Sequence, residues 1–267
     1  MTIDITAVAP TEAESIAYFN NLNPLGRPAI SSPRMAMFSS RMAVADTGDS
    51  LAEISKDAPA IVAFADGVSA ENRSAVLLGV EFAEVVASAS VDINVDPVKW
   101  LGQYAEAMKH AGWLTLGGHE YGEYITSDRS LTMDSIVMDL ISSIAGPNAA
   151  TVLSLMNIVL DKMQNSEPMM KLFERNAKSG NNSSFRIVPC VESAAGIPVT
   201  YLVSVHSRYH SESGGALFWK WSISKMSVKR LAKGVQFSKD SFERNKDRII
   251  GHLGGEADDF FESLKKK

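Results

Sequence analysis

The sequence predicts an α+β fold, in which a helical N-terminal half packs on a C-terminal antiparallel β-sheet within a single compact domain. Two observations favour this class. Apolar residues recur at helical spacing between residues 69 and 163, and from residue 185 onward they alternate with the period of two that is typical of strands. A chain of 267 residues can bury one large core, and no segment has the composition of a linker between domains.

The N-terminal part of the chain differs in composition from the rest. Residues 1–60 are rich in Ala, Ser, Pro and Met, so we expect a partly irregular extension there, followed by one α+β domain over residues 61–267. One short helix is predicted after Thr11, which can form a capping box with Glu14 three residues later.

Two helices and a short strand are predicted next. The first helix begins after Ser69, a residue type that caps helix N-termini. The second begins at Pro97, whose fixed φ suits the first turn, and ends at Gly112. The apolar segment 113–116 then has the pattern of a strand.

An apolar helical hairpin is predicted next. No charged residue lies between Asp139 and Asp161, and the segment 146–148 (Gly-Pro-Asn) stops and restarts the helix. We expect both helices at the centre of the core. The alternative is a pore-forming hairpin, residues 133–163, that enters a membrane. Each arm has only about 12–15 residues, which is too short to cross about 30 Å of hydrocarbon, so burial is favoured.

Strands dominate the C-terminal part of the prediction. Four strands are expected at residues 185–192, 197–206, 216–224 and 225–237, and their short connections favour an antiparallel meander. A final helix is predicted from Ser238.

Composition and motifs exclude several classes of function. The formal net charge of −5 gives no general attraction to phosphate backbones, so no nucleic-acid partner is expected. His206 and His210 would lie about 13 Å apart on a strand, too far for a shared metal ion, and no metal site is expected. The N-terminus has neither the basic nor the long apolar region of a signal peptide, which predicts a cytoplasmic protein by default.

Cys190 is the only cysteine in the sequence, so it cannot form an internal disulfide. It can pack as a small apolar residue, act as a nucleophile or carry an acyl chain. A cysteine-dependent acyltransferase or thioesterase would need a histidine beside the thiol.

The expected register of the first two sheet strands tests that requirement. If their turn centres on Ala195, Cys190 faces Thr200. His206 then faces Ser184, roughly 20 Å along the sheet from the thiol. Another histidine could still approach through folding, but no catalytic residue is predicted, and the chain is expected not to be an enzyme.

An acyl chain on Cys190 would need an apolar channel beside the sheet. Burying about 14 methylene groups there could contribute on the order of 10 kcal/mol. Val188 shares the strand face of Cys190, and paired tryptophans and the uncharged hairpin could complete the walls. The candidate pocket residues are Val188, Trp219, Trp221, Leu140, Ile144, Leu155 and Val159.

Four segments carry a resemblance to a known family. They are Asp66–Arg73, Trp100–Trp113, Phe185–Cys190 and Leu217–Trp221. In this order and spacing, which cover roughly residues 60–255, they resemble the Evf-like family of bacterial virulence factors that act in the insect gut. The resemblance implies a mixed helix-and-sheet fold without an obvious enzymatic site, and a palmitoyl chain on a cysteine in the latter part of the chain. Cys190 is the only position here that could carry it.

We therefore expect a non-enzymatic virulence or host-interaction factor with covalently bound palmitate on Cys190. Its expected partners are the fatty acyl chain and a host or bacterial membrane. We expect the protein either to associate with a membrane or to be exported by a non-classical route. Two alternatives stay open: a pore-forming toxin that uses the hairpin 133–163, and a cysteine-dependent acyltransferase or thioesterase.

Overall fold

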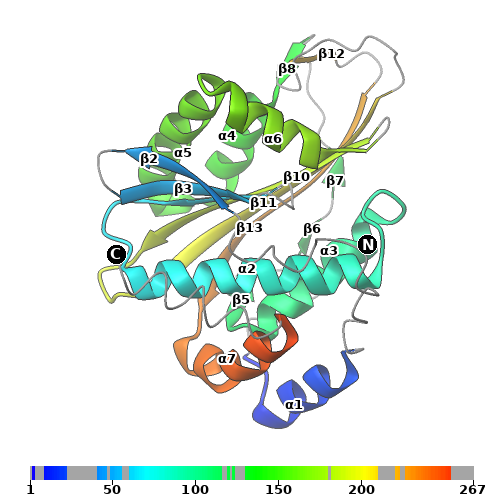
Figure 1. The fold of residues 1–267 in the computed structure, drawn as a ribbon, viewed down its shortest axis with the longest axis vertical. Coiled ribbons are helices and arrows are strands. Elements are labelled where there is room, and N and C mark those ends of the chain that lie inside the picture. The colour runs from blue at the N-terminus through cyan, green and yellow to red at the C-terminus, as the bar shows by residue number, and fades with distance from the viewer. Residues whose placement is uncertain are drawn as a thin grey trace.

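A mixed β-sheet forms the middle layer of the molecule, with helices on both of its faces (Figure 1). The computed structural model describes residues 2–3, 9–22, 41–46, 49–55, 60–115, 119–120, 122–123, 130–179, 182–209, 220–222 and 226–253. Within these residues the elements form one compact α+β body, which confirms the predicted fold class.

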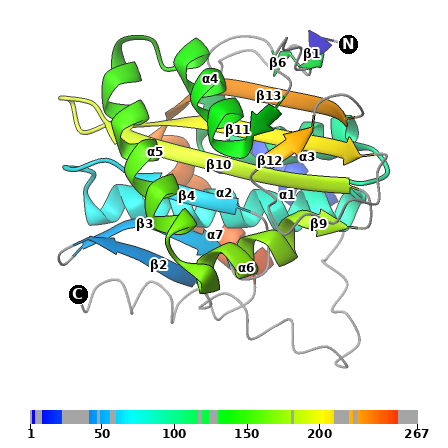
Figure 2. The same cartoon turned by 90° about the horizontal axis from the view of Figure 1, so that it is seen from above.

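The strand order of the main sheet is β2-β3-β4-β10-β11-β13-β5, and Figure 2 shows most of this order from above. The strands are β2 (Arg41–Asp46), β3 (Asp49–Ser55), β4 (Ala60–Phe64), β10 (Asn182–Glu192), β11 (Pro198–Tyr209), β13 (Met226–Phe237) and β5 (Trp113–Thr115). The short strands β7 (Gly122–Glu123) and β9 (Lys178–Ser179) pair with β13 and β10. β4 and β10 run parallel, and the other pairs are antiparallel.

The N-terminal part of the chain contributes more to the sheet than predicted. β2 and β3 lie within residues 1–60, which were expected to form a partly irregular extension, and β4 begins at the end of that segment. β4 pairs with β10 near the middle of the sheet, so the sheet is neither purely C-terminal nor purely antiparallel. The apolar run of β4 lacks the alternation of apolar and polar residues by which half-buried strands are identified in a sequence.

The predicted four-strand meander is wrong at its third strand. β13 pairs directly with β11, from Val199 opposite Gln236 to Tyr209 opposite Met226. Within the predicted strand 216–224, the structure describes β12 (Lys220–Ser222), which pairs with β8 (Ser130–Thr132) in a separate ladder. Alternation predicts that a segment is a strand but does not predict its partner.

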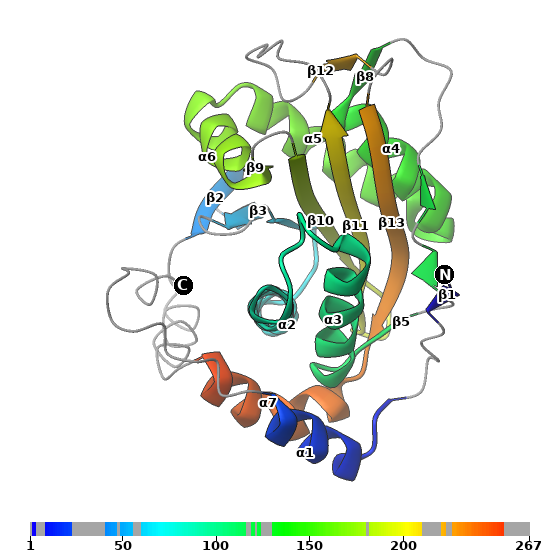
Figure 3. The same cartoon turned by 90° about the vertical axis from the view of Figure 1, so that its right-hand side faces the viewer.

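The helices divide between the two faces of the sheet, as Figure 3 shows. α2 (Ala70–Ser90) and α3 (Pro97–His110) cover one face, with α7 (Lys239–Leu253) and α1 (Glu12–Asn21) at its end. α4 (Met133–Ile144), α5 (Ala149–Gln164) and α6 (Glu167–Ala177) cover the other face. β1 (Thr2–Ile3) and β6 (His119–Glu120) form a small separate ladder.

The predicted helix starts are confirmed. Thr11 and Glu14 form the capping box of α1, and Ser69 caps α2 by accepting a hydrogen bond from the backbone N–H of Asn72. Pro97 occupies the first turn of α3. The hairpin of α4 and α5, joined by the short turn Gly146–Asn148, is also confirmed.

Side-chain alternation along the strands separates the core into two apolar layers. The α2 layer consists of the buried side chains between the sheet and α1, α2, α3 and α7. The α5 layer consists of those between the sheet and α4, α5 and α6. In β10, Val188 and Cys190 belong to the α2 layer, whereas Phe185, Ile187 and Val191 belong to the α5 layer. The sheet itself lies between the two groups.

The close approach of α2 to β5 gives a test of the packing in the α2 layer. A Cβ at Gly79 would lie 2.5 Å from Nε1 and 2.9 Å from Cδ1 of Trp113, which is fully buried. We expect Gly79→Ala to lower the free energy of unfolding by about 1–3 kcal/mol in urea denaturation, because overpacking outweighs the better helix propensity of alanine.

The matched control is Gly251→Ala in α7, where a Cβ would meet no atom within 4 Å. This variant should keep or raise stability, since only the helix propensity changes. Equal effects of the two substitutions would contradict the close packing of α2 on Trp113.

Candidate functional site

Cys190 lies near the C-terminal end of β10 and its side chain is fully buried in the α2 layer. Its strand neighbours are Phe64 of β4 and Thr200 of β11, and the pairing with Thr200 confirms the predicted register. The backbone carbonyl of Cys190 accepts a hydrogen bond from the N–H of Ala65 at 2.9 Å. Its thiol donates a weak hydrogen bond to the carbonyl of Val191, with 3.6 Å between sulfur and oxygen.

The surroundings of Cys190 keep its thiol protonated. Burial raises the pKa of the Cys190 thiol to about 12, and the negative charge of Glu192 acts in the same direction, against a smaller opposing effect of Arg73. The thiolate is the nucleophilic form of cysteine. The folded protein therefore holds Cys190 in a form that is a poor nucleophile at neutral pH.

Thr200 contributes the second polar side chain at this position. Its side chain is 1% exposed, and its hydroxyl oxygen has no hydrogen-bond partner among the described residues. Directly opposed residues in an antiparallel pair have Cβ atoms about 4.5–5.5 Å apart, on the same face of the sheet. The hydroxyl of Thr200 and the thiol of Cys190 therefore emerge side by side under α2.

The structure brings only part of the predicted acyl pocket together. Val188 is buried in the α2 layer with Cys190. The four hairpin candidates belong to the α5 layer, across the sheet from the thiol: Leu140, Leu155 and Val159 are buried there and Ile144 packs against them. Trp219 lies outside the described residues, and the structure describes the backbone of Trp221 in β12 but not its side chain.

Sequence reasoning missed the residues that do share the α2 layer with Cys190. The strand residues among them include Val62, Phe64, Leu202 and Val235, and α2 contributes its buried apolar side chains. The signal for β4 was present in the sequence. Residues 60–64 form a short continuous apolar run, which is typical of a strand buried on both faces.

The described histidines do not form a nucleophile–base pair with Cys190. His206 lies opposite Ser184, as predicted, at the distant end of the same strand pair. His110 and His252 lie in α3 and α7, and the His252 ring packs against Phe19 at 5.6 Å between ring centroids. The structure describes only the backbone of His119, and His210 lies outside the described residues.

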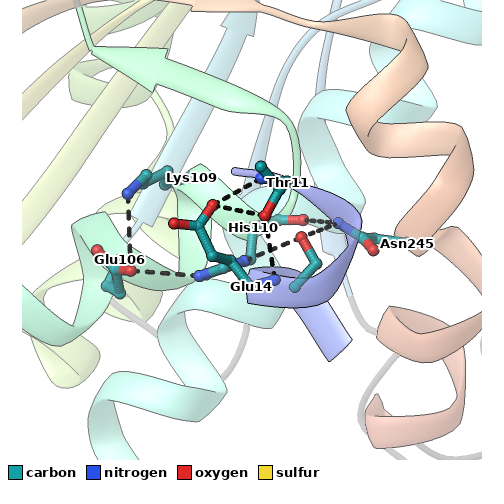
Figure 4. A network of polar contacts seen from close by, with 7 residues as sticks. Thr11, Glu14, Glu106, Lys109, His110 and Asn245 are labelled. Carbon is teal, nitrogen blue, oxygen red and sulfur yellow. Dashed lines mark hydrogen bonds and ion pairs between the residues drawn. The ribbon is translucent and has the colours of Figure 1, made fainter. Parts of the chain in front are cut away.

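A separate polar network, where α1, α3 and α7 meet, connects Ser15 to His110 and His110 to Glu106 (Figure 4). Ser15 Oγ lies 3.3 Å from His110 Nδ1, and His110 Nε2 lies 3.2 Å from Glu106 Oε1. Asn245 Nδ2 donates to Ser15 Oγ at 3.2 Å and to the carbonyl of His110 at 2.9 Å.

This network connects three helices and is closed to solvent at the serine. Ser15 is 1% exposed, and the ring of Tyr18 stacks on His110 with 3.9 Å between centroids. The hydrogen bond from His110 lowers the pKa of the Glu106 carboxyl. The arrangement satisfies buried polar groups where α1, α3 and α7 meet, and it offers a substrate no approach to Ser15.

Two contacts fix α2 to β10, one of them inside the core. Arg186 of β10 donates from Nε and Nη2 to the two carboxylate oxygens of Glu84, both at 2.6 Å. The guanidinium lies over the ring of Trp100, 4.7 Å from its centroid. Burial raises the pKa of Glu84, and Arg186 opposes that effect.

The second contact holds the N-terminal end of α2. Glu192, at the end of β10, accepts hydrogen bonds from the backbone N–H of Ser69 at 2.9 Å and from the side-chain amide of Asn72 at 2.6 Å. These bonds lower the pKa of the Glu192 carboxyl, with the Ser69 N–H as the largest cause. Cys190 lies on β10 between this contact and the Glu84–Arg186 pair.

No group of three or more His, Cys, Asp or Glu side chains in the described residues could hold a metal ion. Among the helices that the structure describes, none combines the length and the apolar character needed to cross a membrane.

The solved structures that are similar to this chain in fold include the following two. One is a delta-endotoxin, with a TM-score of 0.43 and 8% sequence identity, covering 68% of this chain and 83% of its own. The other is the Evf virulence factor, with a TM-score of 0.39 and 12% identity, covering 90% of this chain and 88% of its own. No protein-family model matches the sequence, and no curated protein sequence matches it either. The similarities are of fold alone.

The Glu84–Arg186 pair gives a test of how α2 is held. Glu84→Gln should lower the free energy of unfolding by about 3–5 kcal/mol in urea denaturation, because it leaves the Arg186 charge buried without its counter-ion. The double variant Glu84→Leu/Arg186→Met should be much closer to the original stability, because both charges are removed. A double variant as unstable as the single one would show that packing, and not charge pairing, dominates here.

Proposed function

We propose that this protein is a non-enzymatic virulence or host-interaction factor that carries a fatty acyl chain, palmitate in the first instance, as a thioester on Cys190. One observation supports the proposal most directly. The only thiol of the sequence is directed into the apolar α2 layer and is fully buried there. An acyl chain attached at this point would lie among apolar side chains, where water and competing thiols have little access to the thioester.

The energetic gain from burying such a chain is comparable to the whole stability of a domain, about 5–15 kcal/mol. Burying about 14 methylene groups contributes on the order of 10 kcal/mol. The layer is closed around the thiol in the unmodified chain, so the acyl chain needs α2 and its neighbours to move away from the sheet. The lipid would then be either a part of the core or, with α2 displaced, a membrane anchor.

The chemistry of attachment limits when it can happen. The Cys190 sulfur would attack the carbonyl carbon of an acyl thioester donor, so that a new S–C bond forms and the donor's C–S bond breaks. The proton of the Cys190 thiol passes to the donor's departing thiolate, which leaves as a thiol. With a thiol pKa of about 12 and no exposed surface, Cys190 is poorly suited to this attack in the folded state. Acyl transfer would therefore precede the closing of α2 on the sheet.

The intact mass of the protein tests the proposal. We expect protein from its natural producing cells to carry a mass increment equal to one fatty acyl group, which hydroxylamine removes under denaturing conditions. Cys190→Ser should lack the increment, because serine offers no thiol for the thioester. An unmodified mass for the original protein from these cells would contradict the proposal and leave Cys190 as a packed core residue.

A second candidate, a pore-forming hairpin, is favoured by the outer face of α4 and α5. The exposed positions between Asp139 and Asp161 carry no charge, although exposed helix faces usually do. They include Ser142, Ser143, Thr151, Ser154, Asn157 and Ile158, the last of which is 42% exposed. An uncharged outer face lowers the cost of moving the hairpin from water to lipid.

Dye release from phosphatidylcholine–phosphatidylserine vesicles separates the two functions. The acyl-carrying factor should release no dye: it should bind the vesicles if the acyl chain is an anchor and remain unbound if the chain stays in the core. If the hairpin enters the bilayer, dye release should occur and Ser154→Asp should suppress it, because a carboxylate at a helix centre costs about 3 kcal/mol on insertion. The control Ala89→Asp adds the same charge at an exposed position of α2 and should leave release unchanged.

A further inference from the structure

Several buried polar atoms on one side of the sheet have no hydrogen-bond partner among the described residues. They are the Thr200 hydroxyl, Nε1 of Trp113, Nη1 of Arg186, the Ser241 hydroxyl and the Tyr18 hydroxyl. All five come from the sheet face or the helices that bound the α2 layer. Folded proteins leave few such groups, and each one calls for a partner such as water or a ligand.

Thr200 is the one of these residues that lies next to a group able to carry a ligand covalently. It is paired with Cys190 across β10 and β11, and both side chains emerge on the α2 side. Opposed Cβ atoms lie about 4.5–5.5 Å apart. An atom one or two bonds beyond the Cys190 sulfur is therefore within hydrogen-bond reach of the threonine hydroxyl.

We propose that the Thr200 hydroxyl donates a hydrogen bond to the carbonyl oxygen of an acyl thioester on Cys190, an inference that rests on the proposed function. A thioester on Cys190 adds a carbonyl oxygen to the α2 layer, where the apolar side chains of Val188 and Phe64 belong to the same cluster as the thiol. Such an oxygen needs a donor, and the Thr200 hydroxyl needs an acceptor. Each group satisfies the other, and Thr200 is then a positioning residue that fixes the direction in which the acyl chain leaves the sulfur.

Isotope-edited infrared spectroscopy measures this hydrogen bond directly. The producing cells are fed palmitate labelled with carbon-13 at the carbonyl, and the thioester carbonyl band is recorded in the original protein and in Thr200→Val. We expect the band of the valine variant at higher wavenumber, because the carbonyl has lost its donor. Thr200→Ser should restore the original position, since it keeps the hydroxyl.

A matched control removes a different buried hydroxyl from the same face of β11. Ser204 is 3% exposed and lies opposite Arg186, which is four residues along β10 from Cys190. Ser204→Ala should leave the carbonyl band in place. A general loosening of the layer would instead shift the band in both the Thr200→Val and the Ser204→Ala protein.

A double-mutant cycle in urea denaturation gives an independent readout. Thr200→Val should reduce the folding equilibrium constant of the acylated protein about fivefold, the effect of one ordinary hydrogen bond. In the Cys190→Ala background, which carries no acyl group, the same substitution should have no destabilising effect, because valine fills the space of threonine without an unpaired hydroxyl.

The outcomes distinguish the inference from the proposed function. If the wild-type protein carries no hydroxylamine-labile acyl group, both the proposed function and this inference are overturned. If the wild-type protein is acylated and its carbonyl band has the same position as that of Thr200→Val, the inference alone is overturned. An equal effect of Thr200→Val with and without the acyl group also overturns it, and indicates that Thr200 binds a buried water molecule.

Discussion

β10 is covered by helices on both faces. The alternation of its side chains between these faces determines which residues of the protein can be in contact. Its parallel neighbour β4 and its antiparallel neighbour β11 extend the same alternation across the sheet. The buried side chains of β4, β10 and β11 that the structure describes are thereby divided between the α2 layer and the α5 layer. Cys190 and Val188 are assigned to one layer and the hairpin helices to the other, so these two apolar features of the sequence cannot form a single pocket.

The α2 layer differs from the α5 layer in its polar content. It contains a buried ion pair between Glu84 and Arg186, a hydrogen-bond network around His110, and the hydroxyl of Thr200 beside the thiol. Buried ion pairs contribute little net stability but are costly to disrupt, so the Glu84–Arg186 pair fixes the position of α2 more than it stabilises the fold. The ion pair and the network around His110 thus hold helices in place, whereas the Thr200 hydroxyl lies beside the thiol.

The sequence predicted the local features of the fold well. Caps at Thr11 and Ser69, the proline at the start of α3 and the stop at residues 146–148 identify helix ends, because they depend on nearby backbone groups. The register that places Cys190 opposite Thr200 also followed from the position of one turn. For the candidate site, this was enough to place Val188 beside Cys190.

The remaining features depend on contacts that are distant in the sequence. Nothing in residues 60–64 indicates that β4 pairs with β10, more than 100 residues later, since an apolar run fits many partners. Periodicity likewise divides a strand into two faces without indicating which helix covers each face. The hairpin was for this reason expected beside Cys190, although α4 and α5 cover the opposite face.

The two attachments of α2 to β10 differ in kind, and this difference sets the order in which they can break. The bonds from Ser69 and Asn72 to Glu192 lie at the rim, where water can replace them at little cost. The Glu84–Arg186 pair lies in the core, where water cannot. Any force that separates α2 from the sheet should release the N-terminal end first, so that the helix swings about Glu84 as about a hinge. Cys190 lies under the end of α2 that opens first. An acyl donor would therefore gain access to the only thiol of the sequence where the bonds to Glu192 have broken.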